Sequence, residues 1–191
     1  MAAAPDLLKL DAAGFLVNMC MIATFFTVPI WLSKSMEMSD LWKVYVPLSV
    51  FGGTAMMFSS RKADAGSPRK VITMAFAALA TAFFILSLAK TLWMILIGFA
   101  IFFTGFSVLE ATLPAAVSKL ADPMNKGAII GVYNLSQFSG TFVGGMMAGW
   151  LNGKNGGTVF MVLCVASALA AMLINGAEGV TADAAAPGPK I

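Results

Sequence analysis

Apolar residues along the chain fall into six long runs with almost no charge, and most charged residues lie in the short segments between them. The runs cover residues 12–32, 41–60, 71–89, 91–117, 127–151 and 158–177. Each approaches the length of about 20 residues with which an α-helix crosses the hydrocarbon core of a bilayer. The runs lack the alternation of barrel strands, and an open sheet would leave unpaired backbone groups in lipid. We therefore predict an all-α integral membrane protein with six transmembrane helices.

The composition excludes a water-soluble globule. Of the 191 residues, 59% are hydrophobic and 11% are charged, and the mean hydropathy is +0.87. In soluble domains, about a quarter of the residues are charged. The 12 Lys and Arg and 9 Asp and Glu are too few to coat a soluble domain of this length. The apolar surface is therefore expected to face the lipid bilayer.

The residue types also exclude most catalytic chemistry. The chain has no His, which removes Ser-His-Asp triads, Cys-His pairs and His-ligated zinc or haem. Cys20 and Cys164 lie in separate apolar runs, so we interpret them as small buried hydrophobic residues. We expect no metal, no cofactor and no enzymatic activity. The net charge of +3 forms no basic face, so we expect no nucleic-acid partner.

The six runs form one predicted membrane domain over residues 1–178. The second run is the weakest of the six, because its uncharged part, from Val44 to Ser60, is short and contains Pro47 and the Gly52-Gly53 pair. The first run is too long for the core of a signal peptide and lacks a basic leader, so we expect it in the mature protein. Residues 179–191 are rich in Ala, Pro and Gly and have little to bury, so we expect a disordered tail.

The distribution of Lys and Arg between the loops predicts the orientation in the membrane. An even number of spans places both termini on one side. If that side is the cytoplasm, the cytoplasmic basic residues are Lys9, Arg61, Lys62, Arg69, Lys70, Lys119, Lys126 and Lys190, and the external ones are Lys34, Lys43, Lys90 and Lys154. This two-to-one bias predicts a multi-pass protein of the cell inner membrane with both termini cytoplasmic.

Glu110 is an acidic residue well inside a predicted span. It precedes Lys119 by nine residues, so it lies roughly 13 Å from the next loop at 1.5 Å per residue. No Lys or Arg lies at its depth in the runs, and an unpartnered carboxyl group in lipid favours its neutral form. Glu110 is therefore a candidate proton-coupling residue. The alternative is a structural carboxyl group bonded to a loop amide, to Lys119 or to Lys126.

Pro114 follows Glu110 by about one helical turn. Proline has no N–H, so the carbonyl group of Glu110 loses its i+4 donor and the helix is expected to kink there. Pro114 is thus a candidate hinge, although proline kinks also occur in membrane helices without a gating role. Ser107, three residues before Glu110, is a candidate hydrogen-bond partner for the carboxyl group.

The fifth run separates small and polar residues from large apolar residues on a helical wheel. One side holds Gly127, Asn134, Gln137, Thr141, Gly144, Gly145 and Ala148, and the other holds Leu135, Phe142, Val143, Met146 and Trp150. The pairs Gly127/Gly131, Gly140/Gly144 and Gly145/Gly149 repeat the small-xxx-small spacing that lets helix backbones approach closely. We predict that the small side packs against protein and the large side faces lipid.

Three amides are candidate cavity or substrate contacts. Asn134 and Gln137 lie on the small side of the fifth run, and Asn18 lies in the first run. A side-chain amide is expensive to leave in lipid, whereas a threonine hydroxyl can bond to its own helix. The alternative for Asn134 and Gln137 is hydrogen bonding between neighbouring helices.

A resemblance to bacterial major facilitator superfamily transporters of the drug-efflux-like branch is carried by three segments. FFTGFSVLEATLPAAVSKLADPMNKGAIIGVYNLSQFSGTFVGGMMAGWL resembles helices ten and eleven, DLLKLDAAGFLVNMCMIATFFTVPIWL helix seven, and WKVYVPLSVFGG helix eight. The resemblance covers roughly residues 6–177. It places Glu110 at the acidic position of an LLEASLP-like motif and Pro114 at its proline. The superfamily's charged cytoplasmic signature is present only in the degenerate form RKADAGSPRK.

This resemblance implies the six-helix C-terminal half of a transporter, with a central cavity and alternating access between two halves. It implies export of a small organic or drug-like solute by a secondary, proton-coupled antiport mechanism. The expected partners are that solute, protons, and a second six-helix half or a larger membrane complex. The alternative is a non-transporting membrane scaffold or subunit.

Overall fold

The computed structural model describes residues 4–64 and 68–175, with side chains at all of these except residues 4, 59–64 and 153–155. The elements are α1 (Ala4–Leu32), the 3-10 helix η1 (Met38–Asp40), α2 (Trp42–Asp64), α3 (Pro68–Ser87), α4 (Leu92–Leu120) and α5 (Lys126–Asn175). The described residues contain no strand, so the predicted all-α class is confirmed. The expected disordered tail, residues 179–191, lies outside the described residues.

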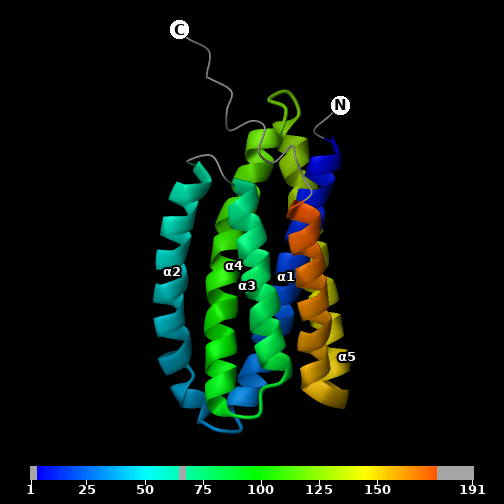
Figure 1. The fold of residues 1–191 in the computed structure, drawn as a ribbon. Coiled ribbons are helices and arrows are strands. Elements are labelled where there is room, and N and C mark those ends of the chain that lie inside the picture. The colour runs from blue at the N-terminus through cyan, green and yellow to red at the C-terminus, as the bar shows by residue number, and fades with distance from the viewer. Residues whose placement is uncertain (1–3, 65–67, 176–191) are drawn as a thin grey trace.

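α5 contains the fifth predicted run and residues 158–175 of the sixth within 50 residues, and it folds back along α1 (Figure 1). Along its first part the contacts with α1 are Gly140 to Phe15 and Gly144 to Met19, and along its second part they are Phe160 to Trp31 and Ser167 to Cys20. The order of the α1 contacts reverses between the two parts. The first part of α5 therefore runs parallel to α1 and the second part antiparallel to it.

Local sequence explains several helix ends. α3 begins at Pro68, where the missing N–H costs least. α4 begins after Thr91, whose hydroxyl accepts a hydrogen bond from the amide of Met94 at 3.4 Å. α1 begins eight residues before the predicted run, because its polar first turns are also helical, with Lys9 Nζ lying 3.0 Å from Asp6 Oδ1.

Four helices are long and apolar enough to cross a membrane, judged by length and composition of the described residues. They are Pro5–Leu32, Pro68–Ser87, Leu92–Leu120 and Gly156–Asn175. The second and fifth predicted runs are not among them, because α2 and the first part of α5 contain more Gly, Ser and other polar residues. The count of six spans stays a prediction.

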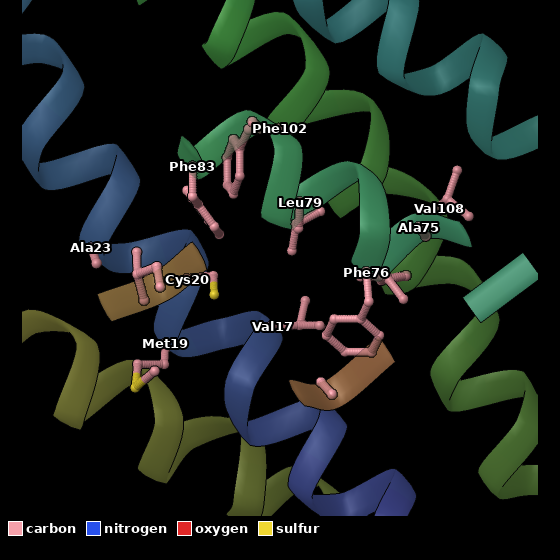
Figure 2. Packing of buried hydrophobic residues seen from close by; sticks show 14 of the residues in the cluster. Val17, Met19, Cys20, Ala23, Ala75, Phe76, Leu79, Phe83, Phe102 and Val108 are labelled. Carbon is pink, nitrogen blue, oxygen red and sulfur yellow. The ribbon is translucent and has the colours of Figure 1, made fainter. Parts of the chain in front are cut away.

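The core lies between α1, α3, α4 and the second part of α5. Figure 2 shows Val17 of α1 beside Phe76 of α3. Phe83 of α3 packs on Phe102 of α4, with ring centroids 5.6 Å apart. Cys20 is fully buried in this core, as predicted, whereas Cys164 is only partly buried.

The two ends of the bundle carry different residues. All four tryptophans lie at the end opposite the chain's N-terminal end. Trp31 is the last residue but one of α1, Trp42 begins α2, Trp93 is the second residue of α4, and Trp150 precedes the fold-back of α5 (Figure 1). Tryptophan is typical of the membrane–water interface. We call this the tryptophan end.

The two basic sets predicted from the sequence lie at opposite ends wherever the structure describes them. Lys34, Lys43 and Lys90 lie at the tryptophan end, and Lys9, Arg69, Lys70, Lys119 and Lys126 lie at the other end. The side chains of Arg61, Lys62 and Lys154, and the whole of Lys190, lie outside the described residues.

Candidate functional site

Polar side chains gather where α1, α4 and α5 meet. They are Asp11 and Asn18 of α1, Glu110 of α4, and Tyr133 and Gln137 of α5. We refer to these five residues as the polar cluster. Three of them were candidates from sequence: Asn18, Glu110 and Gln137.

Tyr133 is the centre of the polar cluster. Its side chain is 2% exposed, and its ring lies against Gly14, where an added Cβ would come 2.6 Å from Cε2. Its hydroxyl accepts a hydrogen bond from Gln137 Nε2 at 3.3 Å. The same side chain interacts electrostatically with Glu110 and Asp11. Tyr133 is therefore bonded to the amide of Gln137 and lies within the electrostatic influence of carboxyl groups on two other helices.

Asp11 brings a second carboxyl group to this region. Ser136 Oγ donates to the backbone carbonyl oxygen of Asp11 at 2.7 Å, which fixes α5 against α1 here. The carboxyl oxygen Oδ1 of Asp11 is buried and accepts no hydrogen bond from the described groups. An unsatisfied buried acceptor is unfavourable and can take up a proton or a donor group.

Sequence reasoning missed Asp11 and Tyr133. Asp11 lies one residue before the first predicted run and was therefore not a candidate, whereas α1 already includes it. Tyr133 was not a candidate either, because the prediction for the fifth run rested on its glycines and amides. Its position one helical turn before Gln137 was the available signal.

Glu110 is exposed on the surface of α4, inside a candidate membrane span. The ion pairs in the described part of the chain, Lys9–Asp6 and Lys43–Asp40, do not involve it. The predicted bond from Ser107 is wrong, because Ser107 Oγ donates to the carbonyl oxygen of Phe103 at 2.8 Å. Serine in a helix commonly bonds to the carbonyl one turn earlier.

α4 remains helical through Pro114, from Leu92 to Leu120. The carbonyl group of Glu110 therefore lacks the intrahelical donor that a residue other than proline would supply at position 114. A carboxyl group and a carbonyl group that has no i+4 donor thus belong to the same residue of this span.

The three candidate amides have different surroundings. Asn18 is 9% exposed, and its Nδ2 donates to the carbonyl oxygen of Gly14 at 3.1 Å. Gln137 is half-buried and bonded to Tyr133. Asn134 is exposed and does not join the polar cluster, because Tyr133 occupies the inward position and the next residue is turned by about 100°.

The glycines of α5 also divide into two groups. Gly140 and Gly144 lie against the backbone of α1, and a Cβ at Gly144 would come 2.5 Å from the carbonyl oxygen of Met19. At Gly145 a Cβ would have ordinary contact with Ile22 at 3.6 Å. Added Cβ atoms at Gly127, Gly131 and Gly149 would meet no described atom within 4 Å.

The large side of the fifth run faces outward, as predicted. Leu135, Phe142, Val143, Met146 and Trp150 are all exposed.

The described residues contain no group of three or more His, Cys, Asp and Glu side chains that could hold a metal ion. The polar cluster is therefore a set of hydrogen-bonding and titratable groups within an apolar helical bundle.

Comparison with known proteins identifies the family. Residues 5–145 match the Major Facilitator Superfamily. The chain belongs to this superfamily. It is 31% identical over 163 residues to the inner membrane transport protein YajR of Escherichia coli (strain K12). The aligned segment covers 83% of the chain and 36% of YajR.

A second superfamily relative is an uncharacterized transporter of Buchnera aphidicola subsp. Baizongia pistaciae (strain Bp). It is 26% identical over 151 residues, or 76% of the chain and 38% of the relative. The chain therefore spans less than two fifths of the length of the curated relatives that it matches. It is a membrane protein of a transporter superfamily, in agreement with its apolar helices.

Proposed function

We propose that the chain is the C-terminal six-helix half of a drug-efflux-like transporter in a cell inner membrane, with both termini cytoplasmic. With a second half, from the same or another polypeptide, it exports a small organic solute in exchange for protons. Neither covalent catalysis nor a cofactor is part of this proposal. The segregation of Lys and Arg to the two ends of the bundle supports the orientation.

The exposed position of Glu110 carries the proposal. Ionisable side chains in membrane spans face a water-filled cavity or other protein rather than lipid. Glu110 lies on α4 about 15 Å from the end of that helix, and the residue is exposed in this chain. We infer that the surface around Glu110 forms a wall of the transport cavity and is faced by the second half.

The polar cluster supplies the groups that such a site needs. Glu110 binds and releases the proton at its carboxyl group. Tyr133, held by Gly14 and Gln137, offers a hydroxyl group near that carboxyl group. Protonation of Glu110 removes a negative charge that acts on Tyr133, which changes the relative stability of two arrangements of α4 and α5.

The remaining candidates have supporting roles in this proposal. Asn18 and Gln137 contact the solute, because each places an amide next to the cluster. Pro114 lets α4 bend near Glu110 as the two halves rock. Asn134 is exposed and contacts either the solute or the second half.

Solute flux in proteoliposomes tests the proposal. The complete transporter containing this chain is reconstituted, and uptake of the organic cation ethidium is measured with and without an imposed pH gradient. We expect Glu110→Gln to reduce gradient-driven flux by at least tenfold and to leave ethidium exchange without a gradient largely intact, because glutamine resembles the neutral acid but releases no proton.

Thr104→Val is the matched control on the same helix, because Thr104 is exposed and donates only to the carbonyl group of Ala100. A Glu110→Gln protein that responds to the pH gradient like the unsubstituted protein would remove the proton role from this residue. Loss of stability in Glu110→Gln, reproduced by Lys119→Ala or Lys126→Ala, would favour the structural role instead.

A membrane scaffold or subunit is the second candidate function. It is favoured by the open surroundings of Gly127, Gly131 and Gly149, since small residues let another helix approach closely. Native mass spectrometry separates the two functions when combined with flux. If all native partners are present and the chain forms a stable complex that transports none of the tested solutes, the scaffold function is supported.

A further inference from the structure

A polar cleft lies at the tryptophan end, remote from the polar cluster. It has a volume of about 230 Å³ and lies between the end of α1 and the start of α4. Its lining includes Trp31, Lys34, Ser35, Lys90, Thr91 and Ile95. Two lysines from separate loops thus line one concavity.

The cleft has a positive charge that its own lining does not balance. Lys34 and Lys90 line it, and no Asp or Glu is among the described lining residues. The ion pair described at this end joins Lys43 to Asp40, at 2.7 Å, and leaves out both cleft lysines. α4 also begins here, and the first amides of a helix have no intrahelical partner and carry partial positive charge.

The floor of the cleft is apolar and rigid. Ile95 is 8% exposed and belongs to the hydrophobic core. The ring of Trp31 packs on Phe160 with centroids 5.1 Å apart, so it is fixed in place. Leu92, at the start of α4, adds a further apolar side chain to the lining.

We propose that this cleft binds the headgroup of an anionic phospholipid. The ammonium groups of Lys34 and Lys90 contact the phosphate, and the acyl chains begin against the apolar side chains of Trp31, Leu92 and Ile95. The position of the cleft among the tryptophans places it at headgroup depth. The apolar side chains in the lining favour a lipid over a free phosphate ion, because only a lipid has chains to cover them.

Native mass spectrometry of the full chain, released from nanodiscs, tests the proposal. Nanodiscs contain equal amounts of phosphatidylglycerol and phosphatidylcholine, and the lipids retained on the protein are identified. We expect preferential retention of phosphatidylglycerol. Each lysine near an anionic lipid contributes about fivefold in affinity, so Lys34→Gln with Lys90→Gln should reduce the preference by roughly 25-fold.

Lys43→Gln is the matched control, because Lys43 lies at the same end but pairs with Asp40 outside the cleft. The double variant Lys34→Arg with Lys90→Arg should retain the preference for phosphatidylglycerol. That result would show that substitution at these two positions is tolerated. If the Gln variant fails to fold, the salt dependence of phosphatidylglycerol retention by the unsubstituted chain replaces it, with weaker retention expected at high salt.

Three results would overturn the proposal. They are equal retention of the two lipids, an unchanged preference in the folded Gln variant, and complete displacement of phosphatidylglycerol by inorganic phosphate at millimolar concentration. The last result would identify a free-anion site. None of these measurements depends on transport, so their outcome is independent of the role of Glu110.

Discussion

The ring of Tyr133 lies on the backbone of Gly14, so closely that a Cβ at position 14 would come 2.6 Å from Cε2. This contact holds α5 and α1 in one register beside Glu110 and Asp11. Tyr133 is 2% exposed, so its ring has no open space into which it could move. The glycine is therefore required by the site.

Substitution of Gly14 should displace Tyr133. We expect Gly14→Val to lower the free energy of unfolding by about 1–3 kcal/mol, as overpacking does, and to reduce proton-driven flux at least tenfold. Tyr133→Phe should keep the packing and lose only the bond to Gln137, worth about 1 kcal/mol. Thermal unfolding in detergent and flux in proteoliposomes measure the two effects.

Gly53→Val is the control for the Gly14 substitution, because no described atom lies within 4 Å of a Cβ added there. If Gly14→Val and Gly53→Val have equal effects, the cause is the general helix propensity of the valine and not the contact with Tyr133.

The glycine pair that packs on α1 should be intolerant of larger residues. At Gly144 the obstacle is the backbone of Met19, which cannot rotate away as a side chain can. We expect Gly144→Val to destabilise the protein by more than 2 kcal/mol, measured by thermal unfolding. Gly149→Val, at an open position of the same helix, should change stability by less than about 1 kcal/mol. Similar losses at both positions would contradict this assignment.

Tyr45 should be replaceable by phenylalanine but not by alanine. Its ring stacks on Phe25 at 5.9 Å and meets the edge of Phe99 at 5.3 Å, which joins α2 to α1 and α4. Its hydroxyl is buried and has no hydrogen-bond partner among the described groups. We expect Tyr45→Phe to leave thermal stability unchanged or higher, and Tyr45→Ala to lower it by about 3 kcal/mol. A marked loss in Tyr45→Phe would indicate that the hydroxyl is bonded.

Cysteine labelling should establish the orientation in the membrane. Ser39 and Met124 are exposed and lie in the connections at opposite ends of the bundle. In a Cys164→Ser background, with Cys20 buried, an impermeant maleimide added to intact cells should label Ser39→Cys and leave Met124→Cys unlabelled. The opposite pattern would place the termini outside.

The sequence determined the helical class and the outward-facing side of α5. Both depend on properties that are local along the chain: mean hydropathy, and the repeat of 3.6 residues per turn. This is why Leu135, Phe142 and Met146 were correctly assigned to the exposed side. Glu110 and Pro114 could also be found from sequence, since an acidic residue and a proline stand out in an apolar run.

Tertiary structure alone decided which polar residues share a site. Asp11, Glu110 and Tyr133 come from three helices, and their approach depends on how those helices are rotated and shifted against one another. Contacts at Gly14, Gly140 and Gly144 set that arrangement. The wheel of α5 likewise could not separate Tyr133, which is buried, from Asn134, which is exposed. A helical wheel gives the angle between side chains, but the rotation of the helix toward its neighbours is decided by the packing of backbone against backbone.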